Sequence, residues 1–169
     1  EILSQAEAGE LKIEKEFEDM HSKIEYILTD KLGDIGKKIH TARSRNDQVL
    51  VSIQLYLIDE LNFIKTEVKS LFDLLINLAK KNKNIIMPGY THMRAAMPSS
   101  FGLWFSAYAE ILIDDVISLN STIEIINQNT LGSAAGYGTS FNIDRDFTTN
   151  DLNFKTLKYN SLACQILSL

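Results

Sequence analysis

The stretch from Gln48 to Lys81 reads QVLVSIQLYLIDELNFIKTEVKSLFDLLINLAKK and contains neither proline nor glycine. Large apolar residues return in it every seven positions, in two rows. The first row is Leu50, Leu57, Ile64, Leu71 and Leu78, and the second is Leu61, Val68 and Leu75. A seven-residue repeat keeps one seam of a helix facing its neighbours, as in coiled coils and long bundles. The stretch therefore predicts one helix of roughly 50 Å, with an apolar stripe that needs helical neighbours, some of them from other subunits.

The rest of the chain also favours helices, and its strand signals are weak. An apolar stripe from Met20 to Leu28 predicts a helix that starts near Phe17–Asp19, and Gly33 and Gly36 are expected to end it and open a loop. The other expected elements are a turn at Met87–Tyr90, a second long helix from Pro98-Ser99 to Asn127, a glycine-rich loop at 132–138, a short helix after Asp144, and a helix that begins near Lys155 and still runs at Leu169. The predicted fold class is all-α, a long-helix bundle.

Composition narrows the class of protein. The 169 residues are long enough to bury a core, and the net charge of −5 argues against nucleic acid or an anionic membrane as the main partner. The single cysteine, Cys164, cannot form an internal disulfide, which suits a reducing, cytoplasmic setting. Because the chain begins at Glu1 and stops inside an apolar pattern, we expect it to be a fragment.

A polar cluster lies directly before the long helix. Residues 40–48 read HTARSRNDQ, and every side chain among them except that of Ala42 is polar or charged. Two guanidinium groups, two hydroxyls, two amides and an imidazole beside a helix start can hold carboxylates by charge-assisted hydrogen bonds. A solvated loop with a helix cap is the alternative, since polar loops are the norm.

Arginine is confined to a few places in this chain. The four arginines are Arg43, Arg45, Arg94 and Arg145, whereas the other thirteen basic residues are lysines. Arginine offers a planar fork that lysine cannot reproduce. The arginine-bearing segments are therefore candidates for binding carboxylates.

Three segments, taken in order, resemble one family. Residues 40–48 (HTARSRNDQ), 88–93 (PGYTHM) and 131–136 (LGSAAG) are similar to the H-T-G-R-S-R-N-D-Q, P-G-Y-T-H-L-Q and L-G-S-G-A motifs of the argininosuccinate lyases. These enzymes belong to the fumarase/aspartase superfamily. The first motif is specific to them, and the resemblance covers essentially the whole chain.

The resemblance implies a long-helix bundle and a reversible elimination. The expected reaction splits argininosuccinate into fumarate and arginine through a carbanion held as an aci-carboxylate. It needs no metal or organic cofactor. The family resemblance also implies a homotetramer with active sites shared between subunits, in which residues 1–47 end an amino-terminal domain and residues 48–169 begin the central bundle domain.

Site residues carry over position by position. Thr91 and His92 match the family's catalytic threonine–histidine pair. The residues that match substrate-binding positions are Ser44, Arg45, Asn46, Asp19, His21 and Arg145. Without the resemblance, three of the polar residues have simpler structural explanations. Asp19 can favour a helix start, His21 can be a histidine at the boundary of the core, and Asp47 can cap the long helix.

Three departures from the family pattern stand out. Ala42 replaces the usual glycine, and Met93-Arg94 replaces Leu-Gln. The family's G-S-S-x-M-P-x-K-K-N-P loop, which supplies a serine base and a lysine, is absent from this sequence. We expect that loop beyond Leu169, and we expect the 169-residue chain alone to be inactive.

Two other functions stay open at this point. A different superfamily lyase, such as adenylosuccinate lyase, would use the same scaffold, although residues 43–48 argue against it. A non-enzymatic, crystallin-like helical protein would keep the fold without the activity, although Thr91-His92 and Ser44–Asn46 speak against that.

Overall fold

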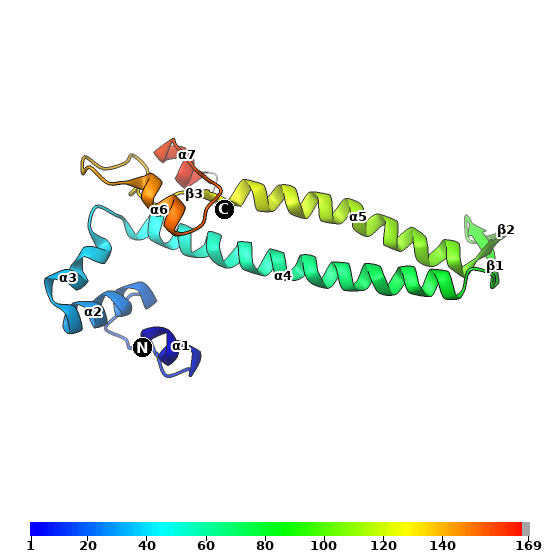
Figure 1. The fold of residues 1–169 in the computed structure, drawn as a ribbon, viewed down its shortest axis with the longest axis horizontal. Coiled ribbons are helices and arrows are strands. Elements are labelled where there is room, and N and C mark those ends of the chain that lie inside the picture. The colour runs from blue at the N-terminus through cyan, green and yellow to red at the C-terminus, as the bar shows by residue number, and fades with distance from the viewer. Residues whose placement is uncertain (167–169) are drawn as a thin grey trace. The chain divides into compact units, whose positions relative to one another are not determined.

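A computed structural model describes residues 1–166 of the chain (Figure 1). It divides into two compact units. One unit comprises Glu1–Val51 together with the chain from Asn129 onward, and the other comprises Ser52–Gln128. Most of the described residues are helical, which confirms the predicted all-α fold class.

The longest element is α4, Arg45–Lys81, a single unbroken helix of 37 residues. Its start lies three residues before the predicted one. The two apolar rows have different surroundings. Leu61, Val68 and Leu75 of the second row are half-buried, whereas the three middle residues of the first row, Leu57, Ile64 and Leu71, are exposed. Leu50 and Leu78, at the ends of the first row, are half-buried. One neighbouring helix therefore leaves the middle of the first row uncovered.

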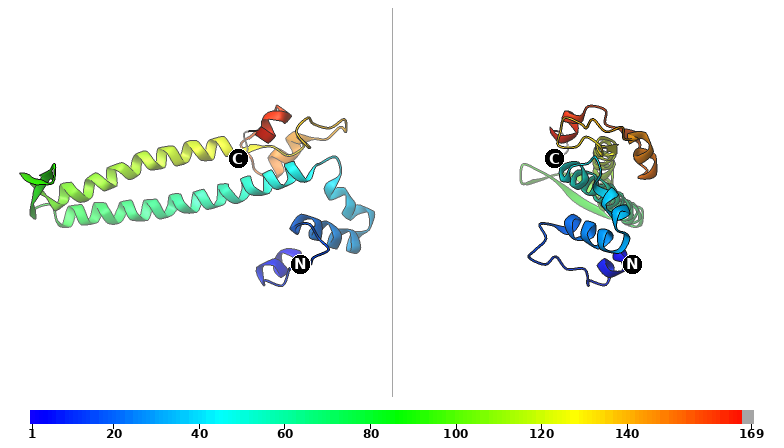
Figure 2. Two further views of the ribbon diagram at one scale, coloured as in Figure 1. Left: turned by 180° about the vertical axis from the view of Figure 1, so that it is seen from behind. Right: turned by 90° about the vertical axis from the view of Figure 1, so that its left-hand side faces the viewer.

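That neighbour is α5, Phe101–Ile126, which runs beside α4 in both Figure 1 and Figure 2. Its N-cap is Ser100, whose hydroxyl accepts a hydrogen bond from the backbone N–H of Leu103. Gly102 is buried against the end of α4, where a Cβ would lie 2.7 Å from the Cα of Lys83. A glycine at this position allows the two backbones to approach closely.

Between the two helices lies a β-hairpin that the sequence did not predict. Strands β1 (Ile86–Thr91) and β2 (Arg94–Ser100) pair antiparallel, with a register irregularity between Pro88 and Tyr90. The expected turn at Met87–Tyr90 is therefore wrong, and so is the expected helix start at Pro98. Proline is tolerated in a two-stranded hairpin because both strands are edges.

The unit that comprises Glu1–Val51 and the chain from Asn129 onward holds short elements. Its helices are α1 (Ile2–Glu7), α2 (Met20–Leu32), α3 (Asp34–Lys37), the 3-10 helix Lys38–His40, the start of α4, α6 (Arg145–Asp151) and α7 (Ser161–Ile166), and the short strands β3 (Gln128–Asn129) and β4 (Thr156–Leu157) pair with each other.

Two sequence expectations about these elements fail. Gly36 lies within α3 rather than in a loop. It is buried, and a Cβ at this position would lie 2.2 Å from the backbone oxygen of Leu28, so the close approach of α2 requires a glycine here. The last helix begins at Ser161 and not near Lys155, since β4 occupies the intervening chain. The part of this prediction that concerns residues 167–169 lies outside the described residues.

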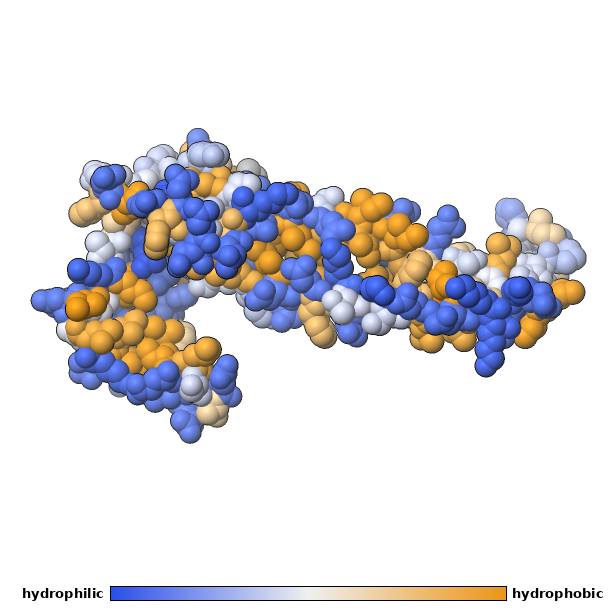
Figure 3. Space-filling view, viewed as in Figure 1, coloured by the Kyte–Doolittle hydropathy of each residue, from blue (hydrophilic) through white to orange (hydrophobic). Residues whose placement is uncertain are grey.

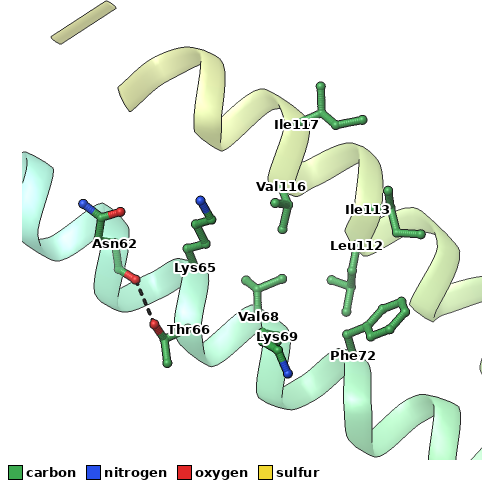
Figure 4. Close-up of a pocket in the computed structure, with 10 residues that line it drawn as sticks. All are labelled: Asn62, Lys65, Thr66, Val68, Lys69, Phe72, Leu112, Ile113, Val116 and Ile117. Atoms are coloured by element: carbon green, nitrogen blue, oxygen red, sulfur yellow. Dashed lines mark hydrogen bonds between the residues drawn. The ribbon is translucent and has the colours of Figure 1, made fainter. Parts of the chain in front are cut away.

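Much apolar surface on the α4–α5 pair is uncovered (Figure 3). A cavity of about 590 Å³ opens between the helices, where Val68 and Phe72 of α4 lie across from Leu112 and Val116 of α5 (Figure 4). Exposed apolar area of this extent marks an interaction surface. None of the helices in residues 1–166 combines the length and apolar character that a membrane crossing requires.

Candidate functional site

The polar motif of residues 40–48 forms the start of α4. The hydroxyl of Ser44 accepts a hydrogen bond from the backbone N–H of Asn46, and the Asp47 carboxylate accepts one from the backbone N–H of Ser44 at 3.0 Å. This reciprocal pattern is a capping box with an aspartate at its third helical position. It explains why the helix begins at Arg45 rather than at Gln48.

Asp47 also joins this motif to the glycine-rich loop. Its second oxygen, Oδ2, accepts hydrogen bonds from the backbone N–H groups of Gly132 at 2.8 Å and Ala134 at 2.9 Å. The Asp47 side chain is completely buried, and three backbone donors satisfy it. The structure thus brings the first and third of the sequence motifs together within one unit.

The loop that Asp47 holds has a constrained backbone. Gly132, Ala134 and Gly136 have φ angles of 86°, 53° and 114°, in the region that favours glycine. Ser133 is buried, and its hydroxyl accepts a hydrogen bond from the Gln165 side chain at 3.1 Å. Ser133 is therefore bound to the chain itself, on the side of the loop that faces α7.

Arg45 lies at the centre of a charged network. Its Nη1 donates to Gln48 Oε1 at 2.7 Å, and its Nη2 lies 3.3 Å from both the Ser22 hydroxyl and Glu25 Oε2. Its Nε forms an ion pair of 3.4 Å with Asp19 Oδ2. The structure therefore places Arg45 and Asp19, two predicted substrate-binding residues, in direct contact.

Asp19 has a second role as the N-cap of α2. Its carboxylate accepts hydrogen bonds from the backbone N–H of Ser22 at 2.7 Å and from the Ser22 hydroxyl at 2.8 Å. The Ser22 backbone N–H is the main cause that lowers the pKa of Asp19, with further lowering from the Ser22 hydroxyl, Arg45 and His21, while burial acts in the opposite direction. His21 itself is half-buried in the first turn of α2.

Glu25 is a member of this network that sequence reasoning missed. Its carboxylate contacts Arg45, and it also lies 3.1 Å from Nδ1 of His40, the first residue of the polar motif. Ser22 was missed as well. The sequence signal of Ser22 and Glu25 is only helical, because they follow Asp19 at intervals that place them on one face of α2. Gln48 is the last residue of the polar motif, and the sequence assigned no role to it.

Arg145 is committed to the fold of its own segment. Its Nε donates to the backbone oxygen of Leu131 at 2.8 Å, and its Nη2 donates to that of Lys158 at 3.0 Å. These bonds hold the loop and the segment around β4 together. They agree with a supporting role, while a direct contact of Arg145 with substrate stays a prediction.

A cavity of about 320 Å³ opens beside the joined motifs. Thr41 and Arg43 of the first motif line it together with Leu131 and Gly132 of the third. Its remaining walls are Ile143, Asp144, Arg145, Phe147 and Thr148. Asn46, in contrast, is exposed on the first turn of α4.

Among residues 1–166, no group of three or more His, Cys, Asp or Glu side chains is placed to hold a metal ion.

The predicted catalytic pair lies in the other unit, at the tip of the hairpin. Thr91 ends β1 and pairs with Arg94, so that His92 and Met93 form a two-residue turn. Their φ angles are 50° and 62°, an arrangement that non-glycine residues adopt at a cost of order 1–3 kcal/mol each. Thr91 and His92 are exposed. A two-residue hairpin turn of type I′ requires a positive φ at both central residues, so the hairpin itself accounts for these angles.

Comparison with known proteins gives concordant results. The profile of a family described as "Lyase" matches residues 1–166. The argininosuccinate lyase of Phocaeicola vulgatus is 53% identical over 165 residues, which are 98% of this chain and 37% of that protein. The argininosuccinate lyase of Bacteroides fragilis is 50% identical over 166 residues, with the same two shares. The chain thus spans little more than a third of the length of these relatives.

A solved structure supports the fold. A variant of EDDS lyase with bound fumarate aligns with 83% of this chain and 28% of its own, at a TM-score of 0.79 and 28% identity. This likeness confirms the predicted long-helix fold of the fumarase/aspartase type.

Proposed function

The chain belongs to the lyase family whose profile it matches, and from that premise we propose that the full-length protein is an argininosuccinate lyase. The strongest support is the sequence identity: over 98% of the chain, about half of the residues are identical to those of proteins named argininosuccinate lyase. The polar motif at the start of α4 is the part of the chain that is specific to that activity.

The proposed reaction is an elimination. A base removes a proton from the carbon beside one substrate carboxylate, and the electron pair is held as an aci-carboxylate. The pair then forms the C=C bond of fumarate as the C–N bond breaks, and the guanidino nitrogen of arginine takes up a proton. Charge grows on a carboxylate in this sequence, so preorganised donors around it accelerate the reaction.

The proposed residue roles concern the binding of the two substrate carboxylates. Arg45 clamps a substrate carboxylate, which replaces Asp19 or Glu25 at its guanidinium, while Ser44 and Asn46 donate to other substrate oxygens. Asp19 and His21 contribute to the same region from α2. The constellation of Asp19 and Arg45 at 3.4 Å supports this part of the proposal.

The catalytic pair is proposed at the hairpin turn. Thr91 hydrogen-bonds a carboxylate of the fumarate portion, and His92 polarises the site or takes part in proton transfer. Arg145 supports the site by holding the loop that follows β3, as its bonds to backbone oxygens suggest.

A shared active site in a homotetramer completes the proposal. Helix α4 alone, with 37 residues, is about 55 Å long. Ser44 and Arg45 are at its first turn, whereas Thr91 and His92 follow its last one. We propose that the two groups meet through different copies of the chain, and the exposed residues Leu57, Ile64 and Leu71 support this by offering a surface for that association.

The domain organisation and location complete the account. Residues 1–47 would end an amino-terminal domain and residues 48–169 would begin the central bundle, and the protein would act in the cytoplasm, where Cys164 stays reduced.

A substrate comparison tests the proposed function. The full-length protein is incubated with argininosuccinate or adenylosuccinate, and fumarate release is followed optically. We expect the protein to release fumarate from argininosuccinate and not from adenylosuccinate. Turnover of adenylosuccinate instead would assign another lyase, and no turnover of either would favour a structural protein. We expect the 169-residue chain, which does not contain the serine–lysine loop motif, to release no fumarate in the same assay.

A further inference from the structure

The guanidinium groups of the two arginines in the polar motif have different surroundings. Arg45 is enclosed by Asp19, Ser22, Glu25 and Gln48. Arg43, two residues earlier, makes no side-chain hydrogen bond or ion pair with any other residue among 1–166, although its side chain is half-buried. A half-buried guanidinium without a partner lacks compensation for the water that it has lost.

Arg43 lines the cavity of about 320 Å³ that lies between the first and third motifs. The other cation there, Arg145, already donates to the backbone oxygens of Leu131 and Lys158. Thr148 is likewise occupied, since its hydroxyl donates to the backbone oxygen of Arg145 and accepts from Asn129. Arg43 is thus the cationic group of the cavity whose guanidinium has no partner among residues 1–166.

The other walls define which ligand suits this cavity. Leu131 is buried and Ile143 is half-buried, and such apolar surroundings strengthen a charge-assisted hydrogen bond, whereas Phe147 is exposed. Asp144 also lines the cavity, with Oδ1 bound to the backbone N–H of Phe147. Because its negative charge offsets part of the positive field, recognition here depends on the paired donors of the Arg43 fork more than on net charge. The volume lies at the lower end of the range of small-ligand sites.

We propose that Arg43 is a further substrate-binding residue, which holds a carboxylate of the ligand by bidentate hydrogen bonds in this cavity. The inference rests on the proposed function for the identity of the ligand. Its carboxylate comes either from the fumarate portion or from the arginine portion of the substrate, and both have the same chemistry at the guanidinium. Asp47 acts indirectly, as a positioning residue that keeps the Gly132 wall of the cavity against the motif.

Equilibrium binding separates the two sources. Calorimetric titrations of the full-length protein with fumarate and with arginine are compared for the wild type, Arg43→Gln and Arg43→Lys. The matched control is Lys38→Gln, which removes an exposed positive charge five residues away. We expect Arg43→Gln to weaken binding of one of the two ligands by about tenfold or more. We expect a smaller loss in Arg43→Lys, and no change in Lys38→Gln.

Turnover supplies a second readout. In steady-state kinetics with argininosuccinate, loss of a binding contact raises KM with little change in kcat, whereas loss of folded protein lowers kcat alone. Wild-type binding of both ligands by Arg43→Gln, or a wild-type protein that binds neither ligand, would overturn the inference. A wild type that binds a ligand through Arg43 but releases no fumarate would overturn only the proposed function. If Arg43→Gln does not fold, the comparison of Arg43→Lys with the wild type decides.

Discussion

The carboxylate of Asp47 accepts a hydrogen bond from the backbone N–H of Gly132 at 2.8 Å, across 85 positions of the sequence. It fixes two motifs that the chain presents far apart, and it does so from a fully buried position. A buried carboxylate is costly unless donors satisfy it, and three backbone N–H groups do so here.

Removing this carboxylate should free the glycine-rich loop. In Asp47→Ala, we expect the amides of Gly132 and Ala134 to exchange with deuterium about tenfold faster or more, because each loses its acceptor. Hydrogen-exchange mass spectrometry of peptides over 130–136 measures the effect. Asp73→Ala, which removes an exposed carboxylate paired with Lys69, is the matched control and should leave these peptides unchanged. Equal exchange in Asp47→Ala and the wild type would show that the contact does not hold the loop.

Gly102 should not tolerate a methyl group. Glycine to alanine normally stabilises a helix, by about 1 kcal/mol. In Gly102→Ala the new Cβ would meet Lys83 Cα at 2.7 Å and the backbone oxygen of Ala79 at 3.2 Å. We therefore expect the free energy of unfolding to fall by about 1–3 kcal/mol. Urea unfolding followed by circular dichroism measures it. The exposed Glu110→Ala on the same helix should change it by less than about 0.5 kcal/mol, and a more stable Gly102→Ala would contradict the close packing of α5 on α4.

The pKa of Asp19 should be below that of an ordinary aspartate. Its lowered pKa means that the folded state favours the carboxylate. The resulting stabilisation is present above the unfolded-state pKa of about 3.9 and is lost as the pH falls through the lower folded-state pKa. Carboxyl-carbon NMR titration of the 169-residue chain gives the midpoint. Ser22→Ala removes the hydroxyl donor but keeps the backbone N–H, so we expect a partial rise, whereas Ser121→Ala should have no effect. A wild-type midpoint at or above the ordinary value would refute this description of the N-cap.

The fork of Arg45 should matter more than its charge. A lysine cannot bond Gln48, Glu25 and Asp19 from one planar group. In the full-length protein we expect Arg45→Lys to lose activity by about 100-fold, the scale of losing one donor to a developing oxyanion. Far-UV circular dichroism should show unchanged helix content. Near-normal kinetics in this variant would remove Arg45 from the proposed substrate-binding residues.

Sequence periodicity predicted the long helices because the seven-residue repeat of α4 is continuous and contains no helix breaker. It did not predict the hairpin, because Pro88 and Pro98 resemble a turn and a helix start, and only the pairing between β1 and β2 shows otherwise. Asp19, Ser100 and Asp144 are of the residue types that commonly cap helices, so local sequence is consistent with the helix starts that follow them.

The candidate site was predictable only in part. Its residue types came from motifs that resemble a family, and Asp19 and Arg45 do lie together. The bond from Asp47 to Gly132 joins segments 85 residues apart, and no local pattern encodes such a contact. Glu25 was missed for a related reason: its partners, His40 and Arg45, are 15 and 20 residues away in the sequence.

We propose that one active site receives Arg45 from one copy of the chain and His92 from another. Subunit mixing tests this arrangement. Full-length Arg45→Ala and His92→Ala proteins, each inactive alone, are dissociated together, reassociated, and assayed for fumarate release from argininosuccinate. We expect activity to return in the mixture, because some sites then combine an intact Arg45 with an intact His92. A mixture that forms hybrid oligomers and stays as inactive as its two components would contradict it.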